Sequence, residues 1–141
     1  MSPKTAASPK ASKSKEDKKT SKVEAKDPGT LVDALRTQDE HLLRLMLIQR
    51  PDLVHPVPTD MAKLAARAAT NSSVTRVLDR LDAWTVGVAE IISVLEEVFT
   101  KKDLQNVLNN NEKIDEALEK LKLLAIIWGN DEGMRCVPVL K

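Results

Sequence analysis

The sequence predicts a mainly α-helical fold, in which a small N-terminal helical bundle packs on a C-terminal unit of three helices and a β-hairpin. Apolar residues recur at helical spacing along most of the chain after residue 29, and short polar breaks divide this pattern into segments of helix length. Near the C-terminus the helical period gives way to two β-prone runs around a glycine-containing turn. With 141 residues, the chain has room for one domain or for two very small domains packed together.

The first 29 residues form a basic segment of low complexity, composed mainly of Lys, Ser, Ala, Pro and Thr. They hold eight lysines and four acidic residues, so within a net charge of +1 the remaining 112 residues carry about −3. Because this segment offers too little apolar surface to offset the entropy cost of ordering it, we expect residues 1–29 to be disordered. Such a segment is typical of an arm whose lysines contact phosphates or acidic proteins. It is equally typical of a linker that keeps a protein soluble.

Residues 30–81 are expected to form the helical bundle. Thr30 and Thr37 each precede an acidic residue by three positions, which predicts capping boxes and two short consecutive helices. The second helix has a broad apolar face and ends near Arg50, because Pro51 cannot continue it. Residues 51–58 contain three prolines and are predicted to be an extended connector.

Two further helices complete the predicted bundle. Thr59 is expected to cap the first of them, whose apolar residues follow the helical pattern closely: Met61, Leu64, Ala65, Ala68 and Ala69. Asn71 and Ser73 belong to the polar break that is expected to cap the next helix. Its apolar stripe consists of Val74, Val77, Leu78 and Leu81.

Residues 82–141 are expected to form the second unit. A buried helix is predicted from Asp82 to a turn near Phe99, and Gly87 is expected to let another helix approach it. Its predicted apolar face comprises Trp84, Val88, Ile91 and Leu95, widened by Ile92 and Val94. Thr100 and Asp103 form a further capping box that opens a second short helix, and a third helix is predicted over residues 112–124 after a run of three asparagines.

The residues that follow, 126–137, are predicted to form a β-hairpin with a loop of four or five residues. Three helices followed by a hairpin are the order of a winged-helix module, in which the third helix is the one usually offered to a DNA major groove. The competing interpretation is a purely helical bundle with a frayed C-terminal tail.

Several stretches resemble a known family. They are Gln49-Arg-Pro-Asp-Leu53, residues 58–69, Ser73-Val, Leu78-Asp-Arg-Leu-Asp82 and residues 127–133. Together they resemble the actinobacterial helicase-associated family that carries the XPB-type helicase N-terminal domain, over roughly residues 30–141. The resemblance implies a non-motor region linked with DNA transactions. Members of that family are generally much longer, so the chain is expected to be a fragment or a reduced standalone form.

The sequence does not favour an enzyme. It lacks the glycine-rich phosphate loop, ending in Lys and Ser or Thr, that an NTP-driven helicase needs. Cys136 falls in a predicted strand, and neither His41 nor His55 has a nucleophile or a set of metal ligands at suitable spacing. We therefore expect no catalysis, no metal, no cofactor and no small-molecule substrate.

The single cysteine and the absence of a signal-like or membrane-spanning apolar run indicate a cytoplasmic protein with no membrane association. If the chain holds DNA, an association with the nucleoid follows.

The candidate contact residues are cations spread over several predicted helices and the hairpin: Lys63, Arg67, Arg76, Arg80, Lys101, Lys102, Lys113, Lys120 and Arg135. The third helix exposes four acids against three lysines, and the hairpin tip is acidic, which argues against sequence-specific reading of bases. Two hypotheses follow. Either the chain is an accessory module with nonspecific, salt-sensitive DNA contact, or its winged helix is an adaptor that docks on a helicase or another DNA-processing protein without binding DNA.

Overall fold

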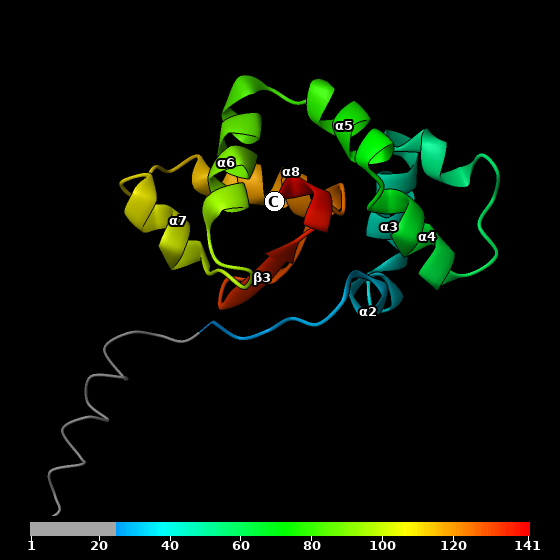
Figure 1. The fold of residues 1–141 in the computed structure, drawn as a ribbon, viewed down its shortest axis with the longest axis horizontal. Helices are drawn as coiled ribbons and strands as arrows, with labels where there is room; N and C mark the ends of the chain where they lie inside the picture. The colour runs from blue at the N-terminus through cyan, green and yellow to red at the C-terminus, as the bar shows by residue number, and fades with distance from the viewer. Residues whose placement is uncertain (1–24) are drawn as a thin grey trace, which may run out of the picture.

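The computed structural model describes residues 25–141, which contain seven α-helices, two short 3-10 helices and one β-hairpin (Figure 1). The α-helices are α2 (Leu31–Arg36), α3 (Glu40–Gln49), α4 (Met61–Ala68), α5 (Asn71–Asp79), α6 (Ala83–Val94), α7 (Lys101–Val107) and α8 (Ile114–Leu123). The strands are β2 (Ile127–Asn130) and β3 (Gly133–Cys136), and the 3-10 helices are η1 (Pro51–Val54) and η2 (Pro138–Leu140). A mainly helical fold with a C-terminal antiparallel hairpin is therefore confirmed.

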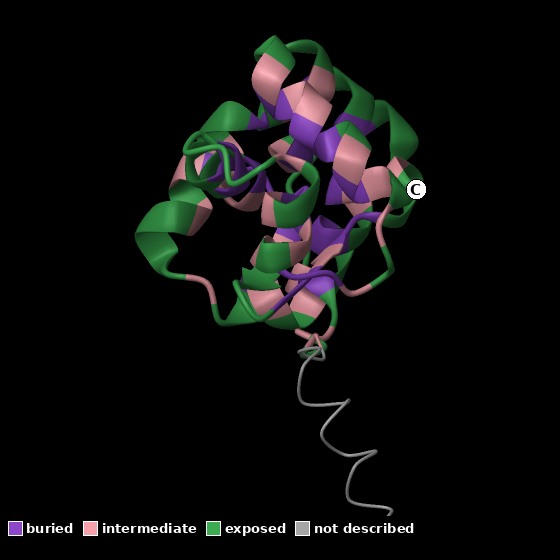
Figure 2. Cartoon of the chain, turned by 90° about the vertical axis from the view of Figure 1, so that its left-hand side faces the viewer, coloured by how far each residue is buried: buried purple, intermediate pink, exposed green. Residues whose placement is uncertain are grey.

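Helix α8 lies between the two groups of helices, with α2 to α5 on one side and α6 and α7 on the other (Figure 1). The buried apolar residues form one cluster that draws on both groups, including Met46 of α3, Val77 of α5, Ile92 of α6 and Leu121 of α8. In Figure 2 these buried positions lie on the inward sides of helices whose outer turns are exposed. The N-terminal helices and the C-terminal unit therefore share a core.

Two of the predicted helix caps are present. The Thr30 hydroxyl accepts a hydrogen bond from the Asp33 amide, and Thr100 and Asp103 form a complete reciprocal capping box at the start of α7. Each cap satisfies backbone amides that have no partner within the helix.

The other predicted caps are wrong. Thr37 ends α2 rather than starting α3, because its hydroxyl donates to the carbonyls of Asp33 and Ala34. Helix α3 begins after Asp39, which makes no side-chain cap bond within the described residues. The N-cap of α3 therefore lies two residues after the predicted one.

The cap positions of α4 and α5 are shifted in the same way. Asp60, not Thr59, caps α4 by accepting from the Lys63 amide, and Thr70 caps α5 by accepting from the Ser73 amide. The polar residues from Asn71 onwards thus belong to the first turn of α5. Where two capable side chains are adjacent, the sequence does not decide between them.

Two predicted connections are also corrected. Residues 51–58 are not extended throughout, because Pro51–Val54 forms a 3-10 helix that buries Leu53 completely. The hairpin turn is shorter than the predicted four or five residues. Asn130 pairs with Gly133, so only two residues connect the strands.

The predicted apolar face of α6 is confirmed in part. Val88 and Ile92 are buried, and Trp84, Ile91 and Leu95 are half-buried against the core. Val94 is instead 81% exposed, and the buried face also includes Thr85 and Ala89. Among residues 25–141, no part of the chain approaches Gly87, since a Cβ there would meet no heavy atom within 4 Å. The expectation that Gly87 admits another helix is therefore wrong within the described chain.

The hairpin is joined to the helices through Phe99. The Phe99 amide donates to the Met134 carbonyl and the Met134 amide donates to the Phe99 carbonyl, with N–O distances of 2.9 and 2.7 Å. Phe99 and Met134 are both fully buried. This bridge places the segment between α6 and α7 beside β3, so β3 lies between Phe99 and β2.

Of the predicted tail of residues 1–29, the structure describes only the last five residues. Residues 1–24 lie outside the described residues, and residues 25–29, which we call the strap, run along the hairpin. Within the described chain, none of the helices has the length and apolar character needed to cross a bilayer.

Candidate functional site

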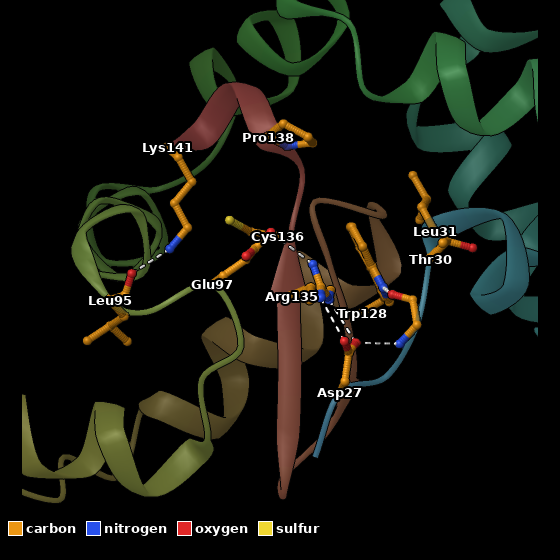
Figure 3. Close-up of a pocket in the computed structure, with 11 residues that line it drawn as sticks. Asp27, Thr30, Leu31, Leu95, Glu97, Trp128, Arg135, Cys136, Pro138 and Lys141 are labelled. Atoms are coloured by element: carbon orange, nitrogen blue, oxygen red, sulfur yellow. Dashed lines mark hydrogen bonds and ion pairs between the residues drawn. The ribbon is translucent and has the colours of Figure 1, made fainter. Parts of the chain in front are cut away.

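The strap is fixed to the hairpin at three positions. The Lys26 amide donates to the Glu132 carbonyl at 2.9 Å, and the side chains of these residues form an ion pair at 3.3 Å. Asp27 accepts two hydrogen bonds from Arg135, and the Trp128 indole donates to the Gly29 carbonyl at 2.8 Å (Figure 3). The Lys-rich N-terminal sequence therefore joins the folded chain at the hairpin.

The two hairpin glycines provide space for this contact. A Cβ at Gly133 would lie 1.6 Å from the Lys26 carbonyl oxygen, so no side chain fits there while the strap is in place. Gly129 has a φ of +118°, a conformation that only glycine adopts without strain, and a Cβ there would lie 2.3 Å from the Gly133 carbonyl oxygen of the hairpin and 3.0 Å from the Pro28 side chain of the strap. The sequence reasoning assigned both glycines to the hairpin alone.

Arg135 holds the strap electrostatically. Its guanidinium contacts Asp27 in a bidentate arrangement at 2.7 and 2.8 Å and Glu97 at 3.1 Å. These hydrogen bonds lower the pKa of Asp27 to about 2 and raise the pKa of Arg135. Bidentate pairing of this kind is among the stronger charge-assisted contacts. Arg135, predicted to contact a partner, is therefore occupied by two carboxylates of its own chain.

A cavity of about 700 Å³ lies behind this contact, between the strap, β3, the end of α6 and the C-terminal residues. Apolar side chains make much of its wall: Leu31, Leu95, Trp128 and Pro138. Burial raises the pKa of the Cys136 thiol on this wall, which opposes formation of a reactive thiolate. Lys141 donates to the carbonyls of Ile92, Leu95 and Glu96 and so caps the C-terminal end of α6; Figure 3 shows the bond to Leu95.

Two other predicted contact residues are also held in ion pairs. Lys101 contacts Asp115 at 2.6 Å and Lys120 contacts Asp82 at 3.0 Å, and hydrogen bonding to these carboxylates raises the pKa of both lysines. The Asp82 carboxylate also accepts from the Thr85 hydroxyl and amide, which holds its pKa well below the usual range. These pairs join α8 to the N-terminal ends of α7 and α6.

The predicted arginines of α4 and α5 have structural contacts as well. Arg67 donates to the carbonyls of Leu53 and Pro56 and thus fixes the connector between α3 and α4. Arg80 donates to the Gln49 carbonyl at 2.8 Å, at the end of α3. Arginine suits such positions because its guanidinium presents several donors in fixed directions.

Four predicted cations have no side-chain hydrogen bond or ion pair with another part of residues 25–141: Lys63, Arg76, Lys102 and Lys113. All four are exposed. They belong to α4, α5, α7 and the residue before α8, so they lie on both sides of the fold rather than on one helix (Figure 1). The structure therefore does not bring the predicted contact residues into one basic patch.

The third helix of the C-terminal unit, α8, presents an acidic outer face. Asp115, Glu116 and Glu119 are exposed along it. Asp115 is paired with Lys101 and Lys120 with Asp82, so Glu116 and Glu119 are the acids of this face that have no ion pair among residues 25–141. Such a face repels the phosphates that line a DNA groove. In the part of the chain that the structure describes, no three His, Cys, Asp or Glu side chains are grouped closely enough to hold a metal ion.

Arg50 is the structural residue that sequence reasoning missed. It is completely buried and donates to the carbonyls of Leu124 and Ala68 and to the Ser73 hydroxyl, each at 2.7 Å. Ser73 in turn donates to Asp52 at 2.6 Å. Burial lowers the pKa of Arg50 to about 10. The available signal was an arginine at a helix end immediately before a proline.

Comparison of the chain with protein-family models, with curated proteins and with solved structures gives no match. The resemblance to the helicase-associated family therefore stays a prediction from the residues that carry it.

Proposed function

We propose that this chain is a non-catalytic module accessory to DNA transactions, which holds nucleic-acid phosphates nonspecifically through its Lys-rich N-terminal sequence. The strap carries this proposal, because it joins that sequence to the hairpin through Lys26 and Asp27. Seven lysines precede the strap, against three acidic residues. Contact with a phosphate backbone requires positive charge and reach but no fixed shape.

The order of elements supports a winged-helix interpretation of residues 82–141. Helix α6 is followed by the short bridge at Phe99, then by α7, α8 and the β2–β3 hairpin. A helix, a short paired segment, two helices and a hairpin follow in the order expected for such a module. In this interpretation α8 corresponds to the recognition helix and the hairpin to the wing.

The charges argue that this wing and helix do not select a DNA sequence. The outer face of α8 is acidic, Lys120 and Lys101 are paired with aspartates, and Arg135 is held by the strap. Base reading in a major groove depends on donors such as Arg, Asn or Gln aimed at base edges. We therefore assign DNA contact to the N-terminal sequence and a supporting role to the body. The family resemblance favours a helicase as the protein that this module serves.

A salt series with the full chain tests the proposal. Binding to a fluorescent duplex is measured by anisotropy for the parent and for a variant in which the seven lysines of residues 1–24 are replaced by glutamine. We expect log K of the parent to fall by about 0.7 to 0.9 per phosphate contact for each tenfold increase in salt, and the variant to lose most of that slope. Unchanged affinity and slope in the variant, or no binding by the parent at low salt, would refute it.

The second candidate is an adaptor whose C-terminal unit binds a protein. It is favoured by the acidic face of α8, which suits a basic protein surface better than DNA. Replacing Glu116 and Glu119 with lysine reverses this face without touching the core. The adaptor hypothesis expects the double variant to lose binding to a helicase that the parent captures. A parent that captures no helicase, or a double variant that captures it equally well, contradicts the hypothesis.

A further inference from the structure

Helix α6 has an apolar outer face in addition to its buried one. Its outer residues, together with one residue at the end of α7, line a shallow groove of about 390 Å³. The apolar lining residues are Ala83, Trp84, Gly87, Ile91, Val94 and Leu108, and the buried Val88 also borders the groove. Glu90 is the one charged residue of α6. A helix that is apolar around most of its circumference is normally covered on all sides.

Gly87 lies in the middle of this face. The space above it is open, because a Cβ there would meet no heavy atom within 4 Å among the described residues. Glycine destabilises a helix interior relative to alanine, and the described part of the chain gains no packing contact at Gly87 in return. A close approach by another backbone is the benefit that a glycine at such a position provides.

The N-terminal sequence does not suit this groove. Residues 1–24 contain Met1 and Val23 as their only large aliphatic side chains, and seven lysines. An apolar groove has no favourable contact to offer lysine ammonium groups, which are costly to remove from water. The apolar lining of the groove instead suits another apolar surface, such as the same α6 face on a second copy of the chain.

We propose that a second copy of this chain docks on the groove, with the two α6 helices antiparallel and crossing at Gly87. Such a pairing is isologous, because the same residues of each copy meet about a two-fold axis. Residue 84 of one copy then faces residue 90 of the other. Each lies three residues from Gly87, which is about 4.5 Å from the two-fold axis measured along the helix.

Charge complementarity supports this arrangement. The Trp84 indole donates to the Lys113 carbonyl at 3.0 Å, so Lys113 is held beside the residue three positions before Gly87. Glu90 lies three positions after Gly87, so the axis places Glu90 of each copy opposite Trp84 and Lys113 of the other. Glu90 and Lys113 are exposed, and neither forms an ion pair among residues 25–141. The pairing gives each of them an oppositely charged partner.

The apolar contacts of the pairing come from side chains that are now exposed to water. Val94, at the end of α6, is 81% exposed and lines the groove. Covering Val94, together with Trp84 and Ile91, removes apolar surface from water and so favours the dimer.

Sedimentation equilibrium of the full chain from about 1 μM to about 1 mM tests the proposal, a range that covers the affinities of ordinary dimers. We expect a concentration-dependent dimer. Gly87→Glu places a like charge from each copy at the axis, so we expect dimerisation to weaken by more than about tenfold. Because Gly87 faces open space and Glu has a higher helix propensity than Gly, this variant keeps the parent's circular dichroism spectrum and melts at the same or a higher temperature at low concentration. A monomeric parent throughout, or a dimer that Gly87→Glu leaves intact, overturns the proposal.

Charge reversal tests the pairing itself. Glu90→Lys and Lys113→Glu each oppose like charges and weaken the dimer, whereas the double variant restores the ion pairs and recovers the parent's association constant. Glu119→Lys on the outer face of α8 is the matched control and leaves dimerisation unchanged. If the double variant associates no better than the single variants, the crossing at Gly87 is wrong.

Discussion

The guanidinium of Arg50 donates to the carbonyl oxygen of Leu124 at 2.7 Å, although the two residues are 74 positions apart. Leu124 follows α8, and a second acceptor of Arg50, the Ala68 carbonyl, ends α4. The last carbonyls of a helix have no partner within the helix, so one buried arginine satisfies two helix ends at once. Arg50 thereby links the N-terminal helices to the C-terminal unit.

Replacing Arg50 with methionine keeps an apolar chain of similar length but leaves these buried acceptors without a donor. Since each unsatisfied buried group costs about 1–3 kcal/mol, we expect a loss of about 3 kcal/mol or more in the free energy of unfolding. Urea unfolding followed by circular dichroism measures it. Arg44→Met, on the exposed side of the same helix, is the control and changes stability by less than about 0.5 kcal/mol. Equal losses in the two variants would contradict the role of Arg50.

The two threonines Thr100 and Thr37 stand in similar sequence patterns but make different contacts. Thr100 caps α7 through a complete capping box, whereas Thr37 follows the end of α2. We expect Thr100→Ala to lower the free energy of unfolding by about 1 kcal/mol and Thr37→Ala to lower it by less. Chemical denaturation of both variants checks this. A larger loss for Thr37→Ala would mean that Thr37, and not Asp39, begins the next helix.

The ion pair between Asp27 and Arg135 makes the strap sensitive to acid. The pKa of Asp27 is about 2 in the folded chain and 3.8 in its reference state, so the unfolded chain binds more protons between these values. The contribution of Asp27 to stability is therefore complete above this window and is lost as the pH falls through it. Asp27→Asn should remove this part of the pH dependence, measured as the urea midpoint between pH 6 and pH 2. Asp39→Asn is the control, and an unchanged profile in Asp27→Asn would refute the contact.

Gly133→Ala tests the contact between strap and hairpin directly. A Cβ at this position would lie 1.6 Å from the Lys26 carbonyl oxygen, so the strap must move away while the hairpin ladder is retained. We expect faster hydrogen exchange at the Lys26 amide, whose bond to Glu132 is broken, with little change at the Met134 amide. Nuclear magnetic resonance resolves both amides. Parental protection at Lys26 would show that the strap does not lie over Gly133.

Sequence periodicity predicted the helices best where a helix buries a regular stripe. The stripe of Ile114, Ala117, Leu118 and Leu121 in α8 is buried as the spacing implies. Periodicity worked less well for α6, because both of its faces are apolar and the pattern does not say which one is covered. Val94 was assigned to the buried face for this reason.

Contacts between distant residues could not be read from the sequence. The pairing of Asp27 with Arg135 spans 108 positions, and nothing in the local pattern around Asp27 marks it as ordered. The nine candidate cations were likewise chosen by charge alone. Whether a cation is free or already paired depends on which acidic side chain the fold places beside it, as with Lys120 and Asp82.

The strap also determines where mechanical load enters the protein. If the sequence before residue 25 is bound and pulled, the force reaches the bonds of Lys26 to Glu132 and of Asp27 to Arg135 before it reaches any helix. From there it passes along β3 to the bridge between Met134 and Phe99, which precedes α7. Tension on the N-terminal sequence therefore acts first on the hairpin, and the helical core lies behind these contacts.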